Sequence, residues 1–406
     1  MDRQALIDRY AELAIRVGVN LQPGQHLLIE GLVEHREMIH AAVKAAYAAG
    51  AGYVEVEYGD QHVRKEMVRN VEEDLLTWSP PHLLKRLTDL AEVKGAFLVI
   101  LGDPEPELFA DLDPGRVGRA HMLEAVEEST RQVNERTVSW AVVACPNDGW
   151  AEAVFGERDA DRLWDAVARA TRLYEEDPVG TWWDRVEELG RRADAMNTRH
   201  FDSLRYEGPG TDLTVGLLEG SRWMSARFET RWGQHHVPNL PTEEIFTSPD
   251  FRRTQGVVTA SRPLQIPSAG VTVRDLKLRF EKGKAVEVEA TQGEGAIRAQ
   301  LQIDDQAPFL GEVALVDKDS AVGRTGLTFG NTLFDENATC HLAYGAGFLF
   351  CVEGADGLSR EGSIAAGLNH SAVHTDFMIG GPELSIYGVT KDGGEVPLIV
   401  DDTWQL

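Results

Sequence analysis

Four short apolar runs divide the first half of the chain, and helical segments lie between them. The runs are HLLIEG (26–31), GYVEVEYG (52–59), GAFLVILGD (95–103) and VSWAVVACP (138–146). Residues 35–49, between the first two runs, have the spacing of an amphipathic helix. A strand, a helix and a second strand within about 30 residues form a βαβ unit, because parallel strands need a crossover connection. The first ~195 residues therefore predict an open parallel α/β domain.

The pattern changes near residue 200. After the charged helical stretch WWDRVEELGRRADAMN (182–197), short strand-like runs alternate with glycine-rich turns. Lys282-Gly283-Lys284 separates two alternating runs, which is typical of a β-hairpin. We therefore expect an N-terminal α/β domain over 1–197, followed over 198–406 by a β-rich α+β domain that carries a metal site.

The net charge excludes one class of partner. Forty basic against 66 acidic residues give a net charge of −26, which repels nucleic acid and anionic lipid. No stretch reaches the ~18 apolar residues that a membrane span needs, and the N-terminus lacks the pattern of a signal peptide. Cys145, Cys340 and Cys351 are too few for a disulfide framework. We expect a cytoplasmic protein with no nucleic-acid or membrane partner.

Possible metal ligands recur in the second half, beside strand and turn patterns. They are Glu243 and Glu244 in NLPTEEIFTSP, Glu312 in FLGEVALVD, Glu336 and His341 in LFDENATCHLAYG, and His374 and Asp376 in NHSAVHTDFMIGG. Each has an ordinary alternative: a solvated carboxylate, a hydrogen-bonded structural histidine, a helix cap or a polar turn. No single fragment establishes a metal site.

His374-Thr375-Asp376 is more specific. In a strand, residues i and i+2 project from the same face, so the imidazole and the carboxylate would point together. Both precede Phe377-Met378-Ile379, an apolar run that we expect to be buried. An ionised carboxylate beside a core costs several kcal/mol unless a cation or another partner compensates it. A metal role and a structural role both remain open for this pair.

Together the candidates have the composition of a two-metal centre. Four carboxylates and two imidazoles exceed the three or four ligands of one zinc ion, and cysteine is absent from the set. Two divalent ions ~3.5–4 Å apart need about this number, with one bridging carboxylate. Such ions would share a water, lower its pKa and polarise a carbonyl. The candidate ligands are Glu244, Glu312, Glu336, His341, His374 and Asp376.

Four of these segments resemble the thermophilic metalloaminopeptidase family, the group of the aminopeptidase T and staphylococcal leucyl types. They match its N-x-P-T/S-x-E-x-F-T, G-E-x-A, L-F-D-E-N-A-x-x-H-x-A and G-L-N-x-S-x-x-H-x-D-F-M-I-G motifs. The matching segments are Asn239–Thr247, Gly311–Ala314, Leu333–Ala343 and Gly367–Gly380. GPGTDLTVGL (208–217) and RVGVNLQPGQ near the N-terminus are also similar, so the resemblance spans most of the chain.

The resemblance implies a homodimer and release of N-terminal residues from short peptides through a dinuclear metal-bound hydroxide. The cofactors would be two ions of zinc or cobalt, with manganese as a further option. The metal ligands would be Glu244, Glu312, His341, His374 and Asp376, with Glu312 as a bridge and Glu336 as a further ligand or neighbouring acid. Glu243 or Glu312 would move the proton to the leaving amine, although related segments can have glycine at the position of Glu243.

One position departs from the family pattern. Members usually carry a catalytic tyrosine seven residues after the first ligand histidine, and here that position is Phe348. A missing oxyanion donor costs ~3 kcal/mol, or about 10²–10³ in rate. Tyr344, three residues after His341, is a candidate replacement, and packing is the alternative explanation for it.

Two other functions fit parts of the pattern. His341, His374 and Asp376 match the two-histidine, one-carboxylate set of a mononuclear Fe(II) site, as in the related dihydroxypyridine ring-cleaving dioxygenases. Such a site does not need Glu244, Glu312 and Glu336, which favours the hydrolase. The second alternative, prompted by Phe348, is a metal-binding homologue with altered catalysis.

Overall fold

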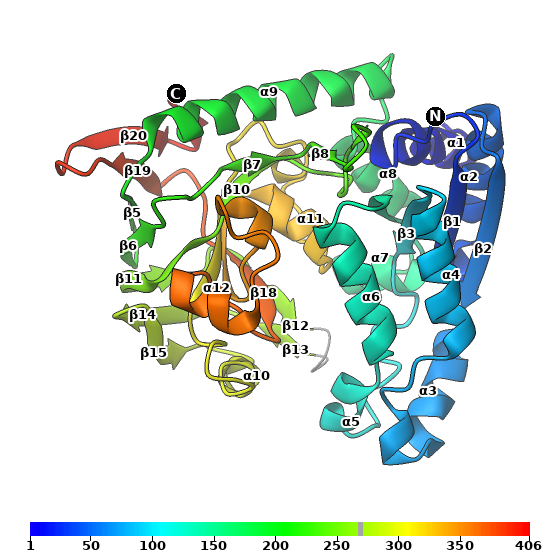
Figure 1. Ribbon diagram of the computed structural model, residues 1–406, viewed down its shortest axis with the longest axis horizontal. Coiled ribbons are helices and arrows are strands. Elements are labelled where there is room, and N and C mark those ends of the chain that lie inside the picture. Colours follow the sequence, from blue (N-terminus) through cyan, green and yellow to red (C-terminus); the bar gives the residue numbers. More distant parts are fainter. Residues whose placement is uncertain (267–270) are drawn as a thin grey trace. The chain divides into compact units, whose positions relative to one another are not determined.

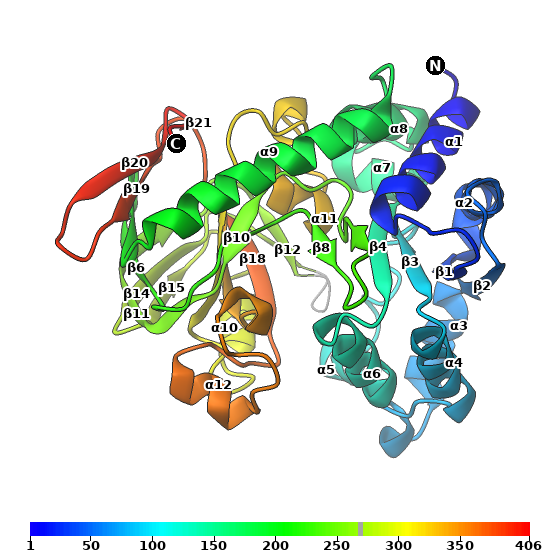
Figure 2. The same ribbon diagram turned by 45° about the horizontal axis from the view of Figure 1, so that its top comes forward.

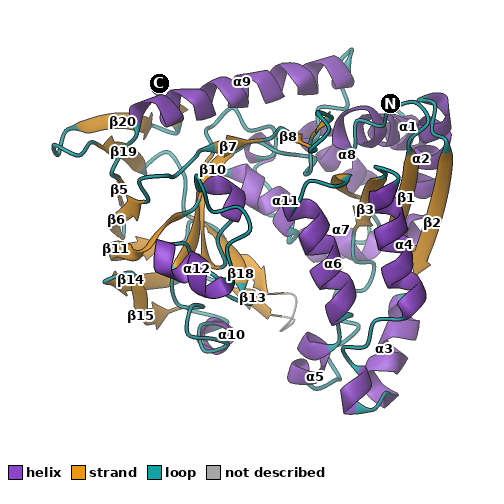
Figure 3. Ribbon diagram, viewed as in Figure 1, coloured by secondary structure: helices purple, strands orange, loops and turns teal. Residues whose placement is uncertain are grey.

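The computed structural model describes residues 1–266 and 271–406, and the chain divides into two compact units. Unit 1 comprises residues 1–185 and 227–242, and unit 2 comprises 186–226, 243–266 and 271–406. Unit 1 is rich in helices and unit 2 in strands (Figure 3). Helix α9 (Pro178–Arg199) carries the chain from unit 1 into unit 2. The domain boundary at residues 197 and 198 stays a prediction.

Unit 1 is built around a parallel sheet with the strand order β2-β1-β3-β4. Its strands are β1 (His26–Leu32), β2 (Tyr53–Gly59), β3 (Ala96–Leu101) and β4 (Ser139–Ala144). Each coincides with one of the four apolar runs, with β1 ending one residue beyond its run, so the predicted parallel α/β fold is confirmed. The short strands β8 (Phe228–Glu229) and β9 (His235–His236) pair with each other.

Helices pack on this sheet and on one another. Helix α2 contacts β1 and β2, whereas α4 contacts β1 and lies beside α6 (Figures 1 and 2). In α2 the buried residues Met38, Ile39, Ala42 and Ala46 recur at helical spacing, which makes the apolar stripe that the sequence predicted. The helices are α1 (Arg3–Leu13), α2 (Arg36–Ala48), α3 (Gln61–Asn70), α4 (Pro81–Glu92), α5 (Pro114–Arg119), α6 (Leu123–Asn134), α7 (Asp148–Phe155) and α8 (Ala160–Ala170). Short turns of helix are η1 (Ala14–Gly18), η2 (Val33–His35) and η3 (Glu73–Leu75).

The outer edge of β4 is covered by the chain segment 227–242. The Val142 N–H donates to Pro238 O at 2.7 Å, and the Leu240 N–H donates back to Val142 O at 3.1 Å. The buried Tyr10 hydroxyl also donates to Leu240 O, at 2.8 Å. A residue range distant in sequence therefore satisfies backbone groups that an edge strand would otherwise leave unpaired.

Unit 2 contains two antiparallel sheets. One has the order β15-β14-β11-β6-β5-β19-β20-β21, and the other has the order β18-β17-β16-β10-β7. The strands are β5 (Ser203–Gly208), β6 (Thr211–Leu217), β7 (Met224–Ser225), β10 (Ile245–Thr247), β11 (Pro249–Thr259), β14 (Lys277–Glu281), β15 (Lys284–Glu289), β16 (Leu310–Leu315), β17 (His341–Gly345), β18 (His374–Met378), β19 (Ser385–Val389), β20 (Glu395–Val400) and β21 (Thr403–Trp404). The pair β12 (Leu264–Ile266) and β13 (Val271–Val273) is separate. The predicted hairpin is confirmed, because β14 and β15 pair across the Lys282-Gly283 turn.

Short helical elements of unit 2 connect these strands. They are α10 (Glu294–Gln300), η5 (Gly323–Thr325), α11 (Thr332–Asp335), η6 (Glu336–Ala338), η7 (Leu349–Cys351) and α12 (Arg360–Ala366). None of the helices within residues 1–266 and 271–406 combines the length and the apolar character that crossing a membrane requires.

All six residues of strand β16, in the five-stranded sheet, are buried. Because Gly311 has no side chain, the backbone of a neighbouring segment can lie close to β16 at this position. A Cβ atom at this position would lie 2.2 Å from Ala346 O, a separation that no side chain tolerates. The glycine of the G-E-x-A segment thus allows the residue 346 backbone to pass over β16 directly beside Glu312.

Candidate metal centre

The register of the five-stranded sheet places the predicted ligands on one face. Ala343 of β17 pairs with Glu312 of β16 on one side and with Asp376 of β18 on the other. Ala314 pairs with His341. Directly paired residues, and residues two apart in a strand, share a face of the sheet. Glu312, His341 and Asp376 therefore project together from three neighbouring strands.

Two further candidates, His374 and Glu244, extend the same face. His374 pairs with Gly345 at the start of β18, two residues before Asp376. Glu244 lies two residues before Phe246 of β10, and Phe246 pairs with Ala314. Five residues from four separate segments of the sequence thus face one another, because β10, β16, β17 and β18 are in register.

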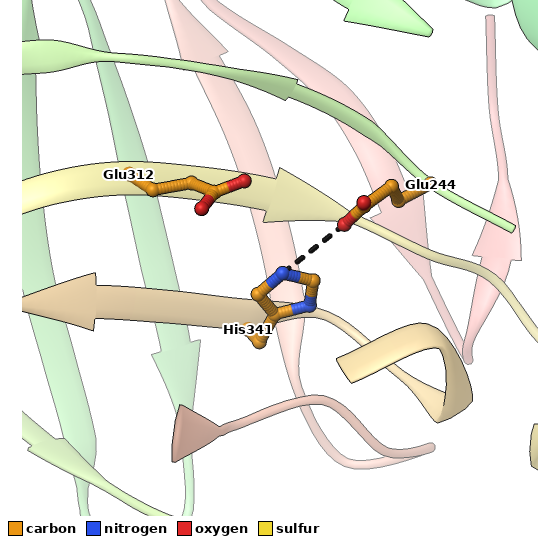
Figure 4. A group of neighbouring side chains, drawn as sticks. All are labelled: Glu244, Glu312 and His341. Atoms are coloured by element: carbon orange, nitrogen blue, oxygen red, sulfur yellow. Dashed lines mark ion pairs between the residues drawn. The ribbon is translucent and has the colours of Figure 1, made fainter. Parts of the chain in front are cut away.

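These side chains form two overlapping groups. The ligand atoms of Glu244, Glu312 and His341 lie within 4.8 Å of one another, and so do those of Glu312, His374 and Asp376. Figure 4 shows the first group, with the Glu244 and Glu312 carboxylates and the His341 ring gathered around a common space. Glu312 belongs to both groups, so its carboxylate lies between two potential metal positions.

Both imidazoles turn Nε2 toward carboxylates. His341 Nε2 is 3.1 Å from Glu244 Oε2, the contact drawn in Figure 4. His374 Nε2 is 3.2 Å from Glu312 Oε2 and 3.4 Å from Asp376 Oδ1. At these distances, the Nε2 atom and the neighbouring carboxylate oxygen could both coordinate one cation.

Backbone carbonyls orient both rings. His341 Nδ1 lies 3.4 Å from Thr339 O, and His374 Nδ1 lies 2.8 Å from Ala346 O. A carbonyl oxygen accepts and never donates, so Nδ1 carries a proton in both rings, and Nε2 is the nitrogen that would offer its lone pair to a cation. This is the usual arrangement of histidines that bind metal, whose second ring nitrogen is held by a hydrogen bond.

Without a cation the site holds excess negative charge. Burial raises the pKa of Glu312 and raises the pKa of Glu336 well above its usual range, and Asp376 adds to both effects. Burial lowers the pKa of His341, but Glu244, Asp376 and Glu312 outweigh it and raise the value to about 10. The carboxylates therefore outnumber the imidazoles, which can supply only part of the compensating positive charge.

The donor set fits divalent metal ions. Glu244 Oε2 is buried, and its contact with His341 Nε2 at 3.1 Å lacks the geometry of a hydrogen bond. A buried carboxylate oxygen without a hydrogen bond is costly. Carboxylate oxygen and imidazole nitrogen are ligands for zinc and for other divalent first-row metals. A cation between these groups would satisfy the oxygen and compensate the buried charge.

Glu336 and Glu243 lie outside the two groups. The Glu336 carboxylate is close enough to Asp376 and Glu244 for their charges to raise its pKa, and its Oε1 accepts from Asn337 Nδ2 at 3.3 Å. Glu243 Oε1 accepts from the Ala321 N–H at 2.9 Å, and the Glu243 N–H donates to Asn337 Oδ1 at 2.7 Å. Glu336 thus borders the ligands, and the carboxylate of Glu243 is fixed by a backbone contact.

Tyr344 is not brought together with the ligands. It pairs with Thr375, so its side chain projects from the opposite face of β17 to His341. The ring is fully buried against Phe377, and the hydroxyl donates to Gln300 Oε1. These contacts are those of a packing residue, which was the other explanation that the sequence allowed for Tyr344. The odd spacing of residues 341 and 344 within one strand already indicated opposite faces.

Phe348 does lie at the site. Its ring centroid is 5.2 Å from that of His374, and its backbone N–H donates to Ser248 Oγ at 2.8 Å. Two further rings, Phe246 and Phe350, contact Phe348 and were not singled out from the sequence. The sequence could have indicated that Phe246 lies at the site, because Phe246 follows Glu244 by two residues and therefore projects from the same face of the strand.

A parallel α/β unit followed by antiparallel sheets, one of them bearing a buried cluster of carboxylates and imidazoles, is an arrangement expected of a metal-dependent enzyme. The thermophilic metalloprotease (M29) family model matches residues 3–404, and the chain belongs to this family. The predicted family resemblance is confirmed.

The relatives agree with this assignment. The chain is 38% identical to aminopeptidase T of Thermus thermophilus over 98% of both chains. It is 37% identical to aminopeptidase 2 of Geobacillus stearothermophilus, over 98% of this chain and 97% of the relative. The solved structure of wild-type AmpT from Thermus thermophilus superposes with a TM-score of 0.90 at 37% identity, covering 99% of each chain.

The fold class and the enzyme class are thereby confirmed. The chain is a metallopeptidase, a hydrolase acting on peptide bonds, and the metalloaminopeptidase prediction holds for the family to which it belongs. A divalent metal requirement follows from the family and from the donor set. The ring-cleaving Fe(II) alternative is not favoured, because the matched family and these relatives are peptidases.

Proposed function

We propose that the chain is a dinuclear metalloaminopeptidase that releases the N-terminal residue of short peptides. The observation that carries the proposal is the position of Glu312 in both candidate ligand groups. Glu244 and His341 would hold one ion, His374 and Asp376 the other, and Glu312 would bridge them. Glu336 would act as a further ligand or a neighbouring acid. We propose zinc or cobalt, with manganese as a further option.

The charge of the cluster supports two ions rather than one. Beside bound cations, with both imidazoles neutral and the carboxylates of Glu244, Glu312, Glu336 and Asp376 ionised, the cluster would carry four negative charges. Two divalent cations neutralise this charge, whereas one cation leaves half of it buried. A separation of ~3.5–4 Å between two ions suits a single bridging carboxylate.

Different residues of the chain would orient the metal ligands and transfer the proton during the reaction. When bound, the ions supply Lewis acidity and an activated water at neutral pH. The Nδ1 contacts of His341 and His374 keep both rings in one orientation. Glu243 or Glu312 would pass the proton to the leaving amine. Glu243 remains a candidate because its side chain is fully buried and directly precedes Glu244 in sequence.

The test combines metal counting with a matched pair of substrates. The protein, loaded with Co²⁺ or Zn²⁺ and freed of excess metal, is analysed for ions per chain. The same sample is then assayed with leucine p-nitroanilide and with N-acetyl-leucine p-nitroanilide. We expect two ions per chain and turnover of the free-amine substrate alone, because an aminopeptidase requires the α-amine.

Three results would contradict the proposal. One iron per anaerobically purified chain would favour the mononuclear oxygenase. A fully loaded site with no turnover would favour the metal-binding homologue with altered catalysis, in line with Phe348 at the family tyrosine position. Hydrolysis of the acetylated substrate at the same rate would exclude an aminopeptidase.

We further propose a cytoplasmic homodimer. Cys145, Cys340 and Cys351 are buried and free, which suits a reducing compartment. Exposed apolar residues of unit 1 offer a surface for a second copy of the chain. Fractionation of the source cells would test the location, and light scattering would test the assembly.

A further inference from the structure

A cavity of about 360 Å³ lies at the carboxyl ends of the parallel strands of unit 1. Its volume is within the range of small-molecule sites. Glu30 of β1, Glu57 of β2 and Leu101 of β3 line the cavity, together with His35 and Asp103 from the segments that follow β1 and β3. The candidate metal ligands all belong to unit 2, so the cavity and the metal centre share no residue.

The path of the chain opens a crevice at this edge of the sheet. A Cβ atom at Gly31 would lie 3.1 Å from Ile39 Cδ1, so Gly31 faces helix α2. Glu30, the residue before it, faces Arg86 of helix α4 on the opposite side of the sheet. Helix α2 follows β1, whereas α6 follows β3 and packs against α4. The chain therefore leaves the neighbouring strands β1 and β3 on opposite faces, and open α/β sheets commonly bind ligands between two such strands.

His35 joins the ends of these two strands and lines the cavity. Its Nδ1 accepts a hydrogen bond from the Leu32 N–H at 3.1 Å, and its Nε2–H donates to Gly102 O at 2.8 Å. Both ring nitrogens are thus engaged in the neutral form of the imidazole. Burial lowers the pKa of His35, which keeps the ring uncharged at neutral pH. His35 therefore shapes the cavity without adding positive charge to it.

The charged side chains that line the cavity are acidic. Glu30 and Glu57 pair across β1 and β2, so both face α4. Arg86 contacts both carboxylates and also lies 3.7 Å from Glu55, so three carboxylates share one guanidinium. Asp103 adds a further carboxylate. Neither lysine nor arginine is found among the described residues that line the cavity, and its lining therefore has a net negative charge.

The Glu30 carboxylate lacks a close hydrogen-bond donor within the described part of the chain. Its Oε1 lies 3.5 Å from Arg86 Nη2, beyond the usual length of a hydrogen bond, while Glu57 makes the close contact with that nitrogen. Burial raises the pKa of Glu30, and the charge of Arg86 offsets only part of this effect. A positively charged donor in the cavity would hydrogen-bond to Glu30 and stabilise its ionised form.

An apolar strip lies on the same face of the sheet as these carboxylates. Val99 of β3 pairs with Glu30 of β1, and Leu101 projects from the same face two residues later. Both side chains line the cavity, and Leu101 is 38% exposed. Covering such a side chain removes apolar surface from water. The cavity thus combines carboxylates, which suit a cationic group, with an adjacent surface that suits a short carbon chain.

We infer that this cavity binds a small organic cation: a primary amine with a short apolar group and no carboxylate of its own. Glu30 and Glu57 bind the ammonium group, and Val99 and Leu101 contact the apolar group. The negative charge of the lining repels phosphate and free carboxylates. A metal ion fits less well, because the groups of described side chains that are close enough to hold one lie at the metal centre of unit 2.

Calorimetric titration of the metal-loaded protein with isoamylamine tests the inference. Two matched ligands carry the same branched chain: isocaproate has a carboxylate in place of the ammonium group, and isoamyl alcohol has a hydroxyl. We expect saturable binding of the amine. Isocaproate and the alcohol should bind at least about tenfold more weakly, because neither can donate a charge-assisted hydrogen bond to Glu30.

Two variants of the cavity extend the test. Glu30→Gln should weaken binding of isoamylamine at least about tenfold. Glu287→Gln is the matched control, since Glu287 is also a strand glutamate in contact with an arginine, Arg279, but belongs to unit 2. Leu101→Trp changes an exposed position and should abolish binding by filling the cavity. Circular dichroism of each variant checks that the fold persists.

Asp376→Asn distinguishes this cavity from the metal centre, which could itself bind an amine. Binding that Asp376→Asn retains, and that Glu30→Gln and Leu101→Trp lose, supports the inference. Wild-type affinity in both cavity variants overturns it, and so does a wild-type protein that binds no isoamylamine or binds isocaproate equally well. Each of these outcomes is independent of peptidase turnover, which the p-nitroanilide assay measures separately.

Discussion

Tyr344 and His341 belong to one strand but project from opposite faces of it. The Tyr344 hydroxyl donates to Gln300 Oε1, which also accepts from Thr375 Oγ1 at 3.3 Å. Gln300 ends α10, so this contact ties a helix to the rear of the strands that bear the ligands. A hydroxyl in this position supports the sheet and does not reach a substrate on the other face.

Replacement of Tyr344 by phenylalanine tests this placement. We expect Tyr344→Phe to keep kcat within about threefold of wild type and to lower the free energy of unfolding by about 1 kcal/mol, the usual contribution of one hydrogen bond. Steady-state kinetics and urea unfolding measure the two effects. A fall of about 100-fold in kcat with unchanged substrate binding would instead identify Tyr344 as the missing oxyanion donor.

The buried side chain of His236 makes the stability of unit 1 depend on pH. Burial among Trp140 and Phe228 lowers the pKa of His236 to about 4, whereas in the unfolded chain it is about 6.5. Between these values the unfolded chain binds a proton that the folded chain does not. The contribution of His236 to stability is therefore present above pH ~6.5 and is lost as the pH falls toward 4.

Replacing His236 with a residue that does not titrate should make the stability of the protein depend less on pH. We expect the stability lost between pH 7 and pH 4.5 to be roughly 2 kcal/mol smaller in His236→Phe than in wild type. Thermal unfolding at a series of pH values measures the difference. His235→Gln is the control, since the His235 side chain is 43% exposed. Parallel curves for wild type and His236→Phe would show that the buried imidazole does not titrate in this range.

At the scale of elements, β16 and β18 contribute unequally to the proposed two-ion centre. β16 supplies Glu312, which lies in both ligand groups, whereas β18 supplies two ligands to one group. Loss of the shared residue should weaken both metal positions. Loss of a residue from one group should weaken one position.

Metal counts in two variants distinguish these contributions. We expect Asp376→Asn to retain about one tightly bound ion per chain and Glu312→Gln to retain less, because the bridge serves both ions. Elemental analysis after gel filtration measures the content. Each change removes one carboxylate charge and keeps the shape of the side chain, so the two variants control for each other. Equal loss of metal in both would contradict the bridging role.

Sequence patterns predicted elements better than their pairing. The strand β4 followed from the run VSWAVVACP, and the common direction of His374 and Asp376 followed from alternation within β18. The order β18-β17-β16-β10-β7 could not be predicted, because no local pattern specifies which distant strands pair. The contact of Glu243 with the Ala321 N–H is likewise a result of tertiary packing. The family resemblance indicated the ligand residues, and the register gives the physical reason that they meet.

At the scale of the whole molecule, unit 1 presents apolar side chains on its surface. The Leu123 N–H donates to Thr77 O at 3.0 Å, which brings two segments together. Trp78, Met122, Leu123 and Val126 are 56%, 42%, 43% and 49% exposed. Exposed patches of this kind commonly mark sites of protein association.

The proposed homodimer can be tested on this patch. We expect Trp78→Glu to shift the mass measured by light scattering from dimer toward monomer, because a buried unpaired charge is unfavourable in an interface. Ile303→Glu is the control, since Ile303 is an equally exposed apolar residue of unit 2 at 58%. A wild-type monomer would make the homodimer proposal wrong, and a dimeric Trp78→Glu would place the interface elsewhere.

The return of residues 227–242 to unit 1 has a consequence for how the protein is made. While the ribosome is still synthesising the following residues, β4 can already be formed, but Pro238 and Leu240 have not yet reached Val142. The nascent sheet then presents an open edge, the feature that most readily recruits a strand from another chain. A gene truncated at the predicted boundary of residue 197 would make this transient state permanent. Recombinant fragments of unit 1 therefore need the downstream segment to stay dispersed.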